Sequence, residues 1–256
     1  MADSPVRVHV LQDAEDCARY AAVAVAGQIR DAVAARGQCI ISLAGGSTPK
    51  RLYALLADLP ADEVPWNQVI LIWGDERDVP PEHADSNYRM VRETLLDRLP
   101  PERRPQSHRI PVGSQSAAAA ADAYEQVLHN LAPDAAGLKI DVLLLGIGDD
   151  AHTASLFPGT VALNTHDRSV AANWVEKLNT WRVTLTYPQL NNAADVYFLV
   201  CGDSKREALR NIWDGPRDID RYPAQGVLPV GGRVHWLVDR AAATGLEETI
   251  GRINAA

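Results

Sequence analysis

Cysteine is scarce in this chain: the 256 residues contain three, Cys17, Cys39 and Cys201, which are far apart. Cys39 and Cys201 lie in apolar runs typical of strands, so we expect reduced core thiols rather than disulfides. No Cys-x-x-Cys or His-x-x-x-His spacing occurs, and the seven histidines are scattered. These absences argue against a zinc ion held by the protein.

Long apolar runs are absent as well. No segment approaches the roughly 20 apolar residues that a membrane span needs. Residues 1–7 lack the charged-then-apolar pattern of a secretory signal. We therefore expect a cytoplasmic protein with no membrane partner.

Cations are outnumbered: 25 Lys and Arg against 33 Asp and Glu give a formal net charge of −8. A nucleic-acid surface usually needs a basic patch, so we expect no nucleic-acid partner. An anionic small substrate is compatible with this charge, because it needs only a few local cations and oriented backbone N–H groups.

What the chain does contain is an alternation of apolar runs and helical patterns. Strands are predicted at 6–11, 40–43, 69–73, 140–145, 169–174, 182–186, 196–201 and 234–238. Helices are predicted at 14–36, 49–56, 87–99, 116–131 and 204–213. This order indicates an α/β fold, with a largely parallel sheet covered by helices on both faces. No linker is long enough to separate domains, so we expect one domain over residues 1–256.

A glycine turn follows the strand at 40–43 and reads Ala-Gly-Gly-Ser-Thr-Pro at 44–49. Gly45 and Gly46 would let an oxyanion approach the backbone, and Ser47, Thr48 and the helix N-terminal N–H groups could donate to it. A tight turn in which Ser47 or Thr48 is an ordinary N-cap explains the motif equally well. Lys50 and Arg51 favour the anion site, because the macrodipole disfavours cations in a first helical turn.

A second cationic helix start follows the strand at 196–201. Ser204 and Glu207 have the spacing of a capping box, so a helix is expected to begin there. Lys205 and Arg206 add positive charge at that helix start. Only four lysines occur in the chain, and two of them, Lys50 and Lys205, lie at turns from a strand into a helix. We therefore favour contact between Lys205 and an anionic ligand over a solvated charge.

Arg77 lies in Gly-Asp-Glu-Arg-Asp at 74–78, directly after the strand at 69–73. Its acidic neighbours, Asp75 among them, could simply neutralise it. Alternatively, they could aim its guanidinium at a phosphate or at a developing oxyanion. Arg182, which opens a strand, is a weaker candidate for a phosphate contact, and an edge salt bridge explains it at least as well.

His152 follows the apolar strand at 140–145 in the sequence Gly-Ile-Gly-Asp-Asp-Ala-His at 146–152. Ligands in open α/β sheets bind at the carboxyl ends of strands, which is where this histidine lies. A lone histidine is more often structural, but a neighbouring carboxylate such as Asp150 would orient the ring as a general base.

Five motifs in register resemble the 6-phosphogluconolactonase family. They are Leu-Ala-Gly-Gly-Ser-Thr-Pro at 43–49, Gly-Asp-Glu-Arg at 74–77 with Asp-Ser-Asn-Tyr-Arg at 85–89, the segment at 146–158, Arg-Val-Thr-Leu-Thr at 182–186 and Pro-Ala at 223–224. The resemblance implies the fold shared with glucosamine-6-phosphate deaminase and ribose-5-phosphate isomerase. It also implies hydrolysis of 6-phospho-D-glucono-1,5-lactone in the oxidative pentose phosphate pathway, without metal or organic cofactor, and functional coupling to glucose-6-phosphate dehydrogenase.

The same resemblance implies roles for individual residues. His152 would activate water, Asp150 would support it, and Arg77 would bind substrate or stabilise the oxyanion, with Asp75 in the same catalytic group. The 6-phosphate would be held by Gly45, Gly46, Ser47, Thr48, Lys205 and Arg182. Ala151 stands where the family usually has glycine, and a positive φ there would cost on the order of 1 kcal/mol in strain.

Two other functions are compatible with parts of the pattern. Glucosamine-6-phosphate deaminases share the glycine turn, Asp150, His152 and Lys205, but their motif continues into Phe-Asn-Glu-Pro, and here Phe157 stands directly before Pro158. A sugar-phosphate sensor of this fold should carry a basic helix-turn-helix segment, which the chain lacks. The lactonase interpretation is therefore preferred.

Overall fold

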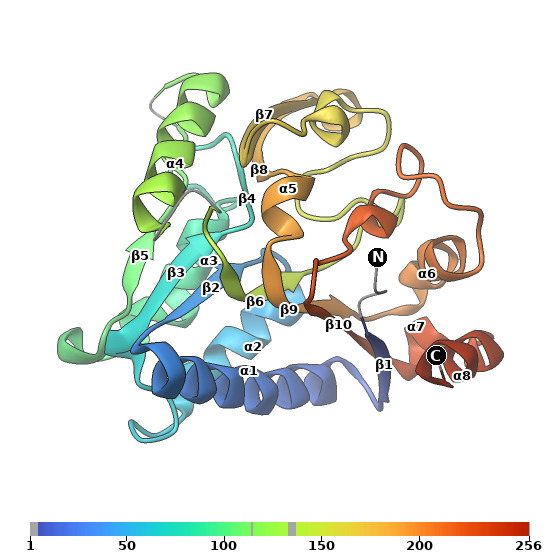
Figure 1. The fold of residues 1–256 in the computed structure, drawn as a ribbon, viewed down its shortest axis with the longest axis horizontal. Coiled ribbons are helices and arrows are strands. Elements are labelled where there is room, and N and C mark those ends of the chain that lie inside the picture. The colour runs from blue at the N-terminus through green and yellow to red at the C-terminus, as the bar shows by residue number, and fades with distance from the viewer. Residues whose placement is uncertain (1–4, 114, 133–136, 256) are drawn as a thin grey trace.

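Seven parallel strands form the central sheet of the computed structural model, which describes residues 5–113, 115–132 and 137–255 (Figure 1). Their spatial order is β1 (Val6–Leu11), β10 (Arg233–Asp239), β9 (Ala193–Val200), β6 (Ile140–Leu145), β2 (Cys39–Leu43), β3 (Val69–Trp73) and β5 (Gln106–His108). Every residue of β2 and β3 is buried, as expected of parallel strands covered on both faces. Residues 1–4, which belong to the segment expected to lack a secretory signal, lie outside the described ranges.

Helices cover the sheet. They are α1 (Ala14–Arg36), α2 (Ser47–Asp58), α3 (Asn87–Thr94), α4 (Ala117–Leu131), α5 (Tyr187–Leu190), α6 (Arg206–Trp213), α7 (Arg240–Ala243) and α8 (Glu247–Ala255). In Figure 1, α1 and α2 lie on one side of the sheet and α5 on the other. The predicted fold class is confirmed.

Local signals account for the longest helix, α1. The Asp13 side chain caps it by accepting a hydrogen bond from the Asp16 N–H, and Gly37 ends it with a φ of +77°. Its buried stripe is rich in alanine, which allows close packing on the sheet. The helix therefore has the boundaries that its sequence predicts.

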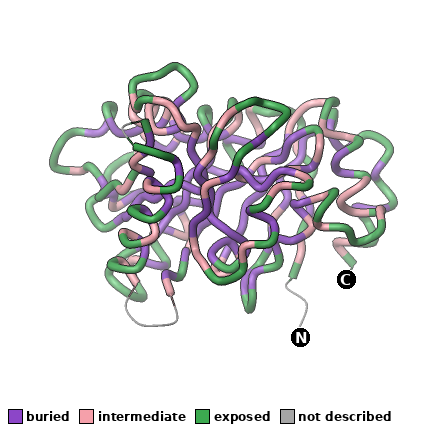
Figure 2. The backbone as a smooth tube through the Cα atoms, turned by 90° about the horizontal axis from the view of Figure 1, so that it is seen from above, coloured by how far each residue is buried: buried purple, intermediate pink, exposed green. Residues whose placement is uncertain are grey.

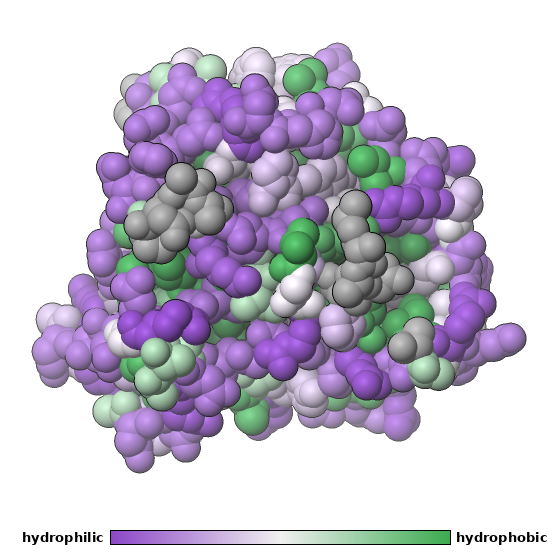
Figure 3. Space-filling model, viewed as in Figure 1, coloured by the Kyte–Doolittle hydropathy of each residue, from purple (hydrophilic) through white to green (hydrophobic). Residues whose placement is uncertain are grey.

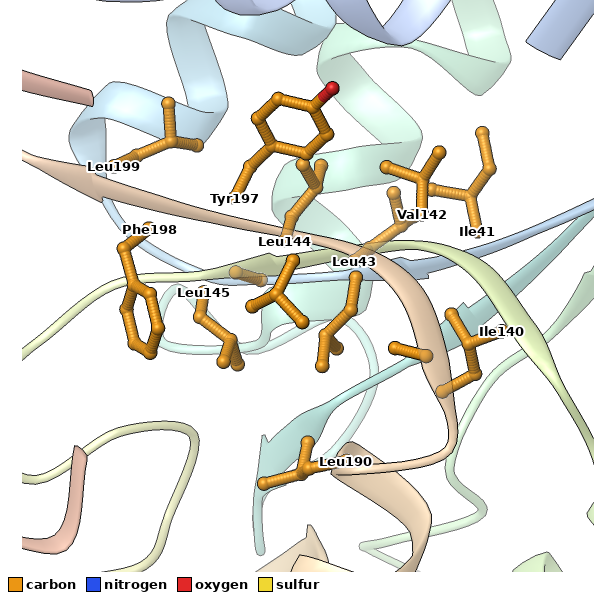
Figure 4. Packing of buried hydrophobic residues seen from close by; sticks show 14 of the residues in the cluster. Ile41, Leu43, Ile140, Val142, Leu144, Leu145, Leu190, Tyr197, Phe198 and Leu199 are labelled. Atoms are coloured by element: carbon orange, nitrogen blue, oxygen red, sulfur yellow. The ribbon is translucent and has the colours of Figure 1, made fainter. Parts of the chain in front are cut away.

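The hydrophobic core lies between these layers. Figure 4 shows Tyr197 and Leu199 on one face of β9 and Phe198 on the other. Figure 2 shows buried backbone in the centre and exposed backbone at the periphery.

Hydrophilic residues dominate the face shown in Figure 3. Among the described residues, no helix combines the length and the apolar character that crossing a membrane requires.

A second, antiparallel sheet contains β4 (Asp75–Arg77), β8 (Thr180–Leu185) and β7 (Val170–Val175). Two predicted strands, at 169–174 and 182–186, are thus strands outside the parallel sheet. Among the strands and α-helices of the described residues, five were not predicted: β4, β5, α5, α7 and α8. The two missed strands have three residues each and no apolar run, so no periodic pattern marks them.

Several helix boundaries differ from prediction. The helix predicted at 87–99 ends at Thr94 and continues as a 3₁₀ turn, Leu96–Arg98, and α2 begins two residues early. The capping box is wrong: a 3₁₀ turn, Asp203–Lys205, precedes α6, and no side chain caps that helix. Gly202, with a φ of +97°, turns the chain from β9 straight into this 3₁₀ turn, which places Ser204 inside it.

Two buried tyrosines hold the strand ends near which polar loops begin. The Tyr53 hydroxyl donates to the Ala44 carbonyl at 2.8 Å and accepts from the Ala44 N–H at 2.9 Å. Tyr124 makes the same pair of bonds with Trp73, at 3.2 Å and 2.7 Å. Burial raises the pKa of both phenols, so they stay neutral donors. Each tyrosine thus satisfies backbone groups where a strand ends.

Tyr53→Phe should lower the free energy of unfolding by about 1–3 kcal/mol, because it leaves buried backbone groups of Ala44 without a partner. Urea denaturation measures this loss. Tyr20→Phe is the matched control, since the Tyr20 hydroxyl bonds His9 at an exposed position, and it should cost less than about 0.5 kcal/mol. Equal losses in the two variants would contradict the anchoring role.

Candidate active site

Four polar segments meet at the carboxyl edge of the central strands. β9, β6, β2 and β3 are adjacent and parallel, and they lead into the segments at 202–205, 146–152, 44–48 and 74–77, of which 75–77 is the strand β4 and 47–48 the start of α2. A hollow of about 140 Å³ opens among the last three of these segments. Its lining includes Gly45, Gly46, Asp75, Arg77 and His152. Residues predicted from separate motifs therefore share one site.

A tight loop presents His152. The Gly148 N–H donates to the His152 carbonyl at 2.8 Å, and Ala151 N–H donates to the Gly148 carbonyl at 3.2 Å. A Cβ at Gly148 would lie 2.0 Å from His152 Nδ1, so only glycine fits. Ala151 has a φ of +62° and Ala154 a φ of +47°. The loop keeps this left-handed backbone even with alanine, at a cost of about 1–2 kcal/mol per residue.

Asp150 orients the imidazole of His152. His152 Nδ1 lies 2.6 Å from Asp150 Oδ1, and a carboxylate only accepts, so in the neutral imidazole Nδ1–H is the donor and Nε2 keeps the free lone pair. The Phe157 ring stacks on His152 with centroids 3.9 Å apart. Burial alone would raise the pKa of Asp150, but hydrogen bonds from His152 and Lys177 outweigh it and hold that pKa below its usual range. Asp150 is therefore an ionised acceptor, and Nε2 is the basic atom.

Asp75 is a buried residue in the wall of the hollow. Its Oδ2 accepts from Ser155 Oγ at 2.6 Å, and Asn87 Nδ2 donates to its carbonyl at 3.0 Å. A Cβ at Gly45 would lie 2.0 Å from Asn87 Oδ1. Gly45 thus makes room for Asn87. The sequence analysis did not predict Ser155 or Asn87 as site residues. Both lie within motifs that resemble the family, and membership of those motifs is the sequence signal that points to them.

Arg77 and Arg182 are opposite one another on β4 and β8. Arg77 donates to the Asp85 carbonyl at 2.6 Å, and among the described residues neither arginine forms an ion pair. Both Nε atoms are buried without a hydrogen-bond partner. Burial lowers the pKa of Arg182. The negative charge of Asp75 raises it and the positive charge of Arg77 lowers it again, so the net shift is downward. Two expectations are therefore wrong: that Arg77 is paired with its acidic neighbours, and that Arg182 forms a salt bridge at the edge of a sheet.

The first turn of α2 has free N–H groups. Gly46, with a φ of +108°, is the N-cap and no side chain caps the helix, so the expectation that Ser47 or Thr48 is the N-cap is wrong. Both lie inside the first turn, where helix geometry leaves their N–H groups without intrahelical partners. No acidic residue occupies this turn. The turn can therefore donate to an anion.

The turn after β9 lies beside the first turn of α2. A hydrogen bond from Cys17 lowers the pKa of the Cys201 thiol against the effect of burial, and one from Thr48 adds to it. Lys205 is half-buried, with no hydrogen bond or ion pair in the described ranges. The structure does not bring Ser47, Thr48, Lys205 or Arg182 into the lining of the hollow, although Ser47 follows Gly46 and Arg182 is opposite Arg77, both of which line it.

Arg51 needs no anion to explain it. Its guanidinium donates to both carboxylate oxygens of Glu15 on α1, at 2.6 Å and 2.7 Å. The inference drawn from the charge of Arg51 is therefore wrong. Lys50 is exposed.

The fold and site define an α/β enzyme class, with a candidate general base and unpaired cations at the carboxyl edge of a parallel sheet. The chain belongs to the glucosamine-6-phosphate isomerase/6-phosphogluconolactonase family, whose model matches residues 12–236. A 6-phosphogluconolactonase of Nostoc sp. is 42% identical over 84% of this chain and 88% of the relative. One from Synechocystis sp. is 40% identical over 94% and 98%. The resemblance inferred from the motifs is confirmed.

Solved structures agree. The 6-phosphogluconolactonase of Trypanosoma brucei superposes with a TM-score of 0.82 at 27% identity, covering 95% of this chain and 99% of that one. A monomeric glucosamine-6-phosphate deaminase has a TM-score of 0.77 at 22% identity, over 93% and 99%. The second likeness shows the fold alone.

Gly148→Ala should lower the free energy of unfolding by about 1–3 kcal/mol, because the added methyl collides with the His152–Asp150 pair. Gly251→Ala is the control: nothing lies within 4 Å of a Cβ there, and alanine in a helix should stabilise by about 0.5–1 kcal/mol. Chemical denaturation compares the two. An unchanged free energy of unfolding in Gly148→Ala would contradict the close approach of Gly148 to the His152–Asp150 pair.

Proposed function

We propose that this chain hydrolyses 6-phospho-D-glucono-1,5-lactone to 6-phospho-D-gluconate, in the oxidative pentose phosphate pathway. The observation that carries the proposal is the His152–Asp150 pair, which leaves Nε2 basic at a hollow beside Arg77. The curated relatives described above carry the name 6-phosphogluconolactonase. Lactone hydrolysis needs a base for water and a cation for the oxyanion, and the site offers both.

In the proposed reaction, His152 Nε2 takes a proton from water as the water oxygen attacks the lactone carbonyl carbon. The carbonyl π electrons move to oxygen, and Arg77 stabilises the resulting oxyanion. When the tetrahedral intermediate collapses, the bond from C1 to the ring oxygen breaks. The imidazolium of His152 returns its proton to that oxygen. Asp150 stays ionised throughout and stabilises the imidazolium.

We propose that the cations and N–H groups around the hollow hold the 6-phosphate. Ser47 and Thr48 begin α2, Gly45 and Gly46 let the backbone approach, and Lys205 and Arg182 form no ion pair with any residue that the structure describes. Because a phosphate dianion would satisfy these charges, its binding accounts for their lack of partners.

Asp75 has a supporting place in this proposal. It lines the hollow, but Ser155 and Asn87 already bond its oxygens. We propose that it contributes to catalysis by holding the β4 turn, which carries Arg77, against the loop that carries His152.

The wider setting is also a proposal. We propose one domain over residues 1–256, since buried residues of both sheets belong to one hydrophobic cluster. The three cysteines are free thiols, with Cys17 and Cys39 buried, which favours a reducing compartment such as the cytoplasm. Glucose-6-phosphate dehydrogenase, which makes the lactone, is the expected functional partner.

His152→Ala should lower kcat/KM by about a hundredfold or more, because it removes the general base. The lactone is generated in place by glucose-6-phosphate dehydrogenase, and its disappearance is compared with a protein-free background. His129→Ala, at an exposed position on α4, is the control. Wild-type protein that fails to exceed background would refute the lactonase proposal, and turnover of glucosamine 6-phosphate would favour a deaminase.

Arg182→Met should raise KM about tenfold or more while kcat changes only a few-fold, because the phosphate contact is remote from the reacting carbon. Its stability should hold or rise slightly, since like charges opposite one another on paired strands are destabilising. Steady-state kinetics and urea denaturation measure the two effects. A loss of stability with unchanged KM would indicate a purely structural arginine.

A further inference from the structure

Lys177 reaches the candidate active site from a different part of the chain. It lies in the 3₁₀ turn Glu176–Leu178, which joins β7 to β8, and Asn179, with a φ of +48°, completes that turn. From this hairpin, Lys177 Nζ forms an ion pair with Asp150 Oδ2. Nothing in the local sequence around Lys177 marked it as part of the site.

The two oxygens of Asp150 have separate partners. Oδ1 accepts from His152 Nδ1 at 2.6 Å and from the His152 backbone N–H at 3.2 Å. Oδ2 accepts from Lys177. The carboxylate cannot rotate without breaking one of these contacts, so Lys177 and His152 fix its plane from opposite ends.

The ring of Phe157 links the same groups on a second side. Lys177 Nζ lies 5.5 Å from the centre of the Phe157 ring, and that ring stacks on His152 with centroids 3.9 Å apart. Lys177, Asp150, His152 and Phe157 therefore form a closed circle of contacts, which holds the imidazole in one orientation.

Charge gives Lys177 a second effect. A carboxylate at hydrogen-bond distance favours the protonated imidazole, and a protonated imidazole cannot take a proton from water. Arg77 and Asp75 of β4 share the hollow with His152, and Asp149 precedes Asp150 in the loop. Among the charged side chains of the described residues other than His152, Lys177 is the one paired with Asp150. It therefore offsets the carboxylate where the effect on His152 is largest.

We propose that Lys177 is a positioning residue for the hydrolysis: it fixes Asp150 so that His152 Nε2 faces the attacking water, and its positive charge offsets that of the carboxylate beside the imidazole. This inference rests on the proposed function. The side chain of Lys177 is 50% exposed, so its replacement should leave the fold intact.

The experiment compares Lys177→Met, Lys177→Arg and wild type in the full chain, with Lys139→Met as the control. Lys139 is an exposed lysine on the surface. The pH profiles of kcat and kcat/KM are measured between about pH 5 and 9.

In Lys177→Met, kcat at neutral pH should fall about tenfold while KM stays within about twofold, because substrate binding is untouched. The acid limb of the profile should move upward by about half to one pH unit, since an unscreened Asp150 favours the imidazolium. Lys177→Arg should restore the position of the acid limb, and Lys139→Met should match wild type.

An acid limb that stays in place when kcat falls would overturn the proposal, and so would a change confined to KM. A proton NMR titration of the His152 ring in wild type and Lys177→Met gives the same comparison without turnover. If wild-type protein shows no lactonase activity, the proposed function fails. The titration then still decides the relation between Lys177 and His152, because an unchanged titration refutes it.

Discussion

Parallel pairing of β9, β6, β2 and β3 is the constraint on which the site depends. Parallel strands end at the same edge, so each turn that follows one of them enters the same region of space. His152, Arg77 and Gly45 lie in three different segments that follow these strands, and they line one hollow for this reason. The hydroxyls of Tyr53 and Tyr124 satisfy the backbone at two of these strand ends.

A buried carboxylate, that of Glu76, joins β4 to α3. Glu76 accepts from the backbone N–H groups of Arg77, Asn87 and Tyr88, at 2.8–2.9 Å. Burial raises the pKa of Glu76 despite these hydrogen bonds. Because the same carboxylate ties the first turn of α3 to the strand of Arg77, the positions of Asn87 and Arg77 depend on each other. The polar floor of the site thus acts as one unit with the small antiparallel sheet.

Ion pairing distinguishes the basic side chains that bind a carboxylate of the protein from those that remain available to an anionic ligand. Arg51 pairs with Glu15 on the surface, and such exposed pairs contribute little beyond local order. Arg77, Arg182 and Lys205 form no ion pair within the described parts of the chain. An acidic protein can hold an anionic substrate in this way, because the local field at the hollow comes from the few cations that no carboxylate neutralises.

The sequence by itself determined the central strands, the long helices and the turns that follow them, because apolar periodicity and capping act over a few residues. It also determined the family, through five motifs in order. Tertiary structure decided what depends on contacts between distant segments: the placing of β7 and β8 in a second sheet, the pairing of Arg51 with Glu15 and the approach of Asn87 to Gly45. It also brought Lys177 to Asp150. The ion pair between Lys177 and Asp150 forms only when the β7–β8 hairpin folds over the loop of His152, and no local pattern encodes that distance.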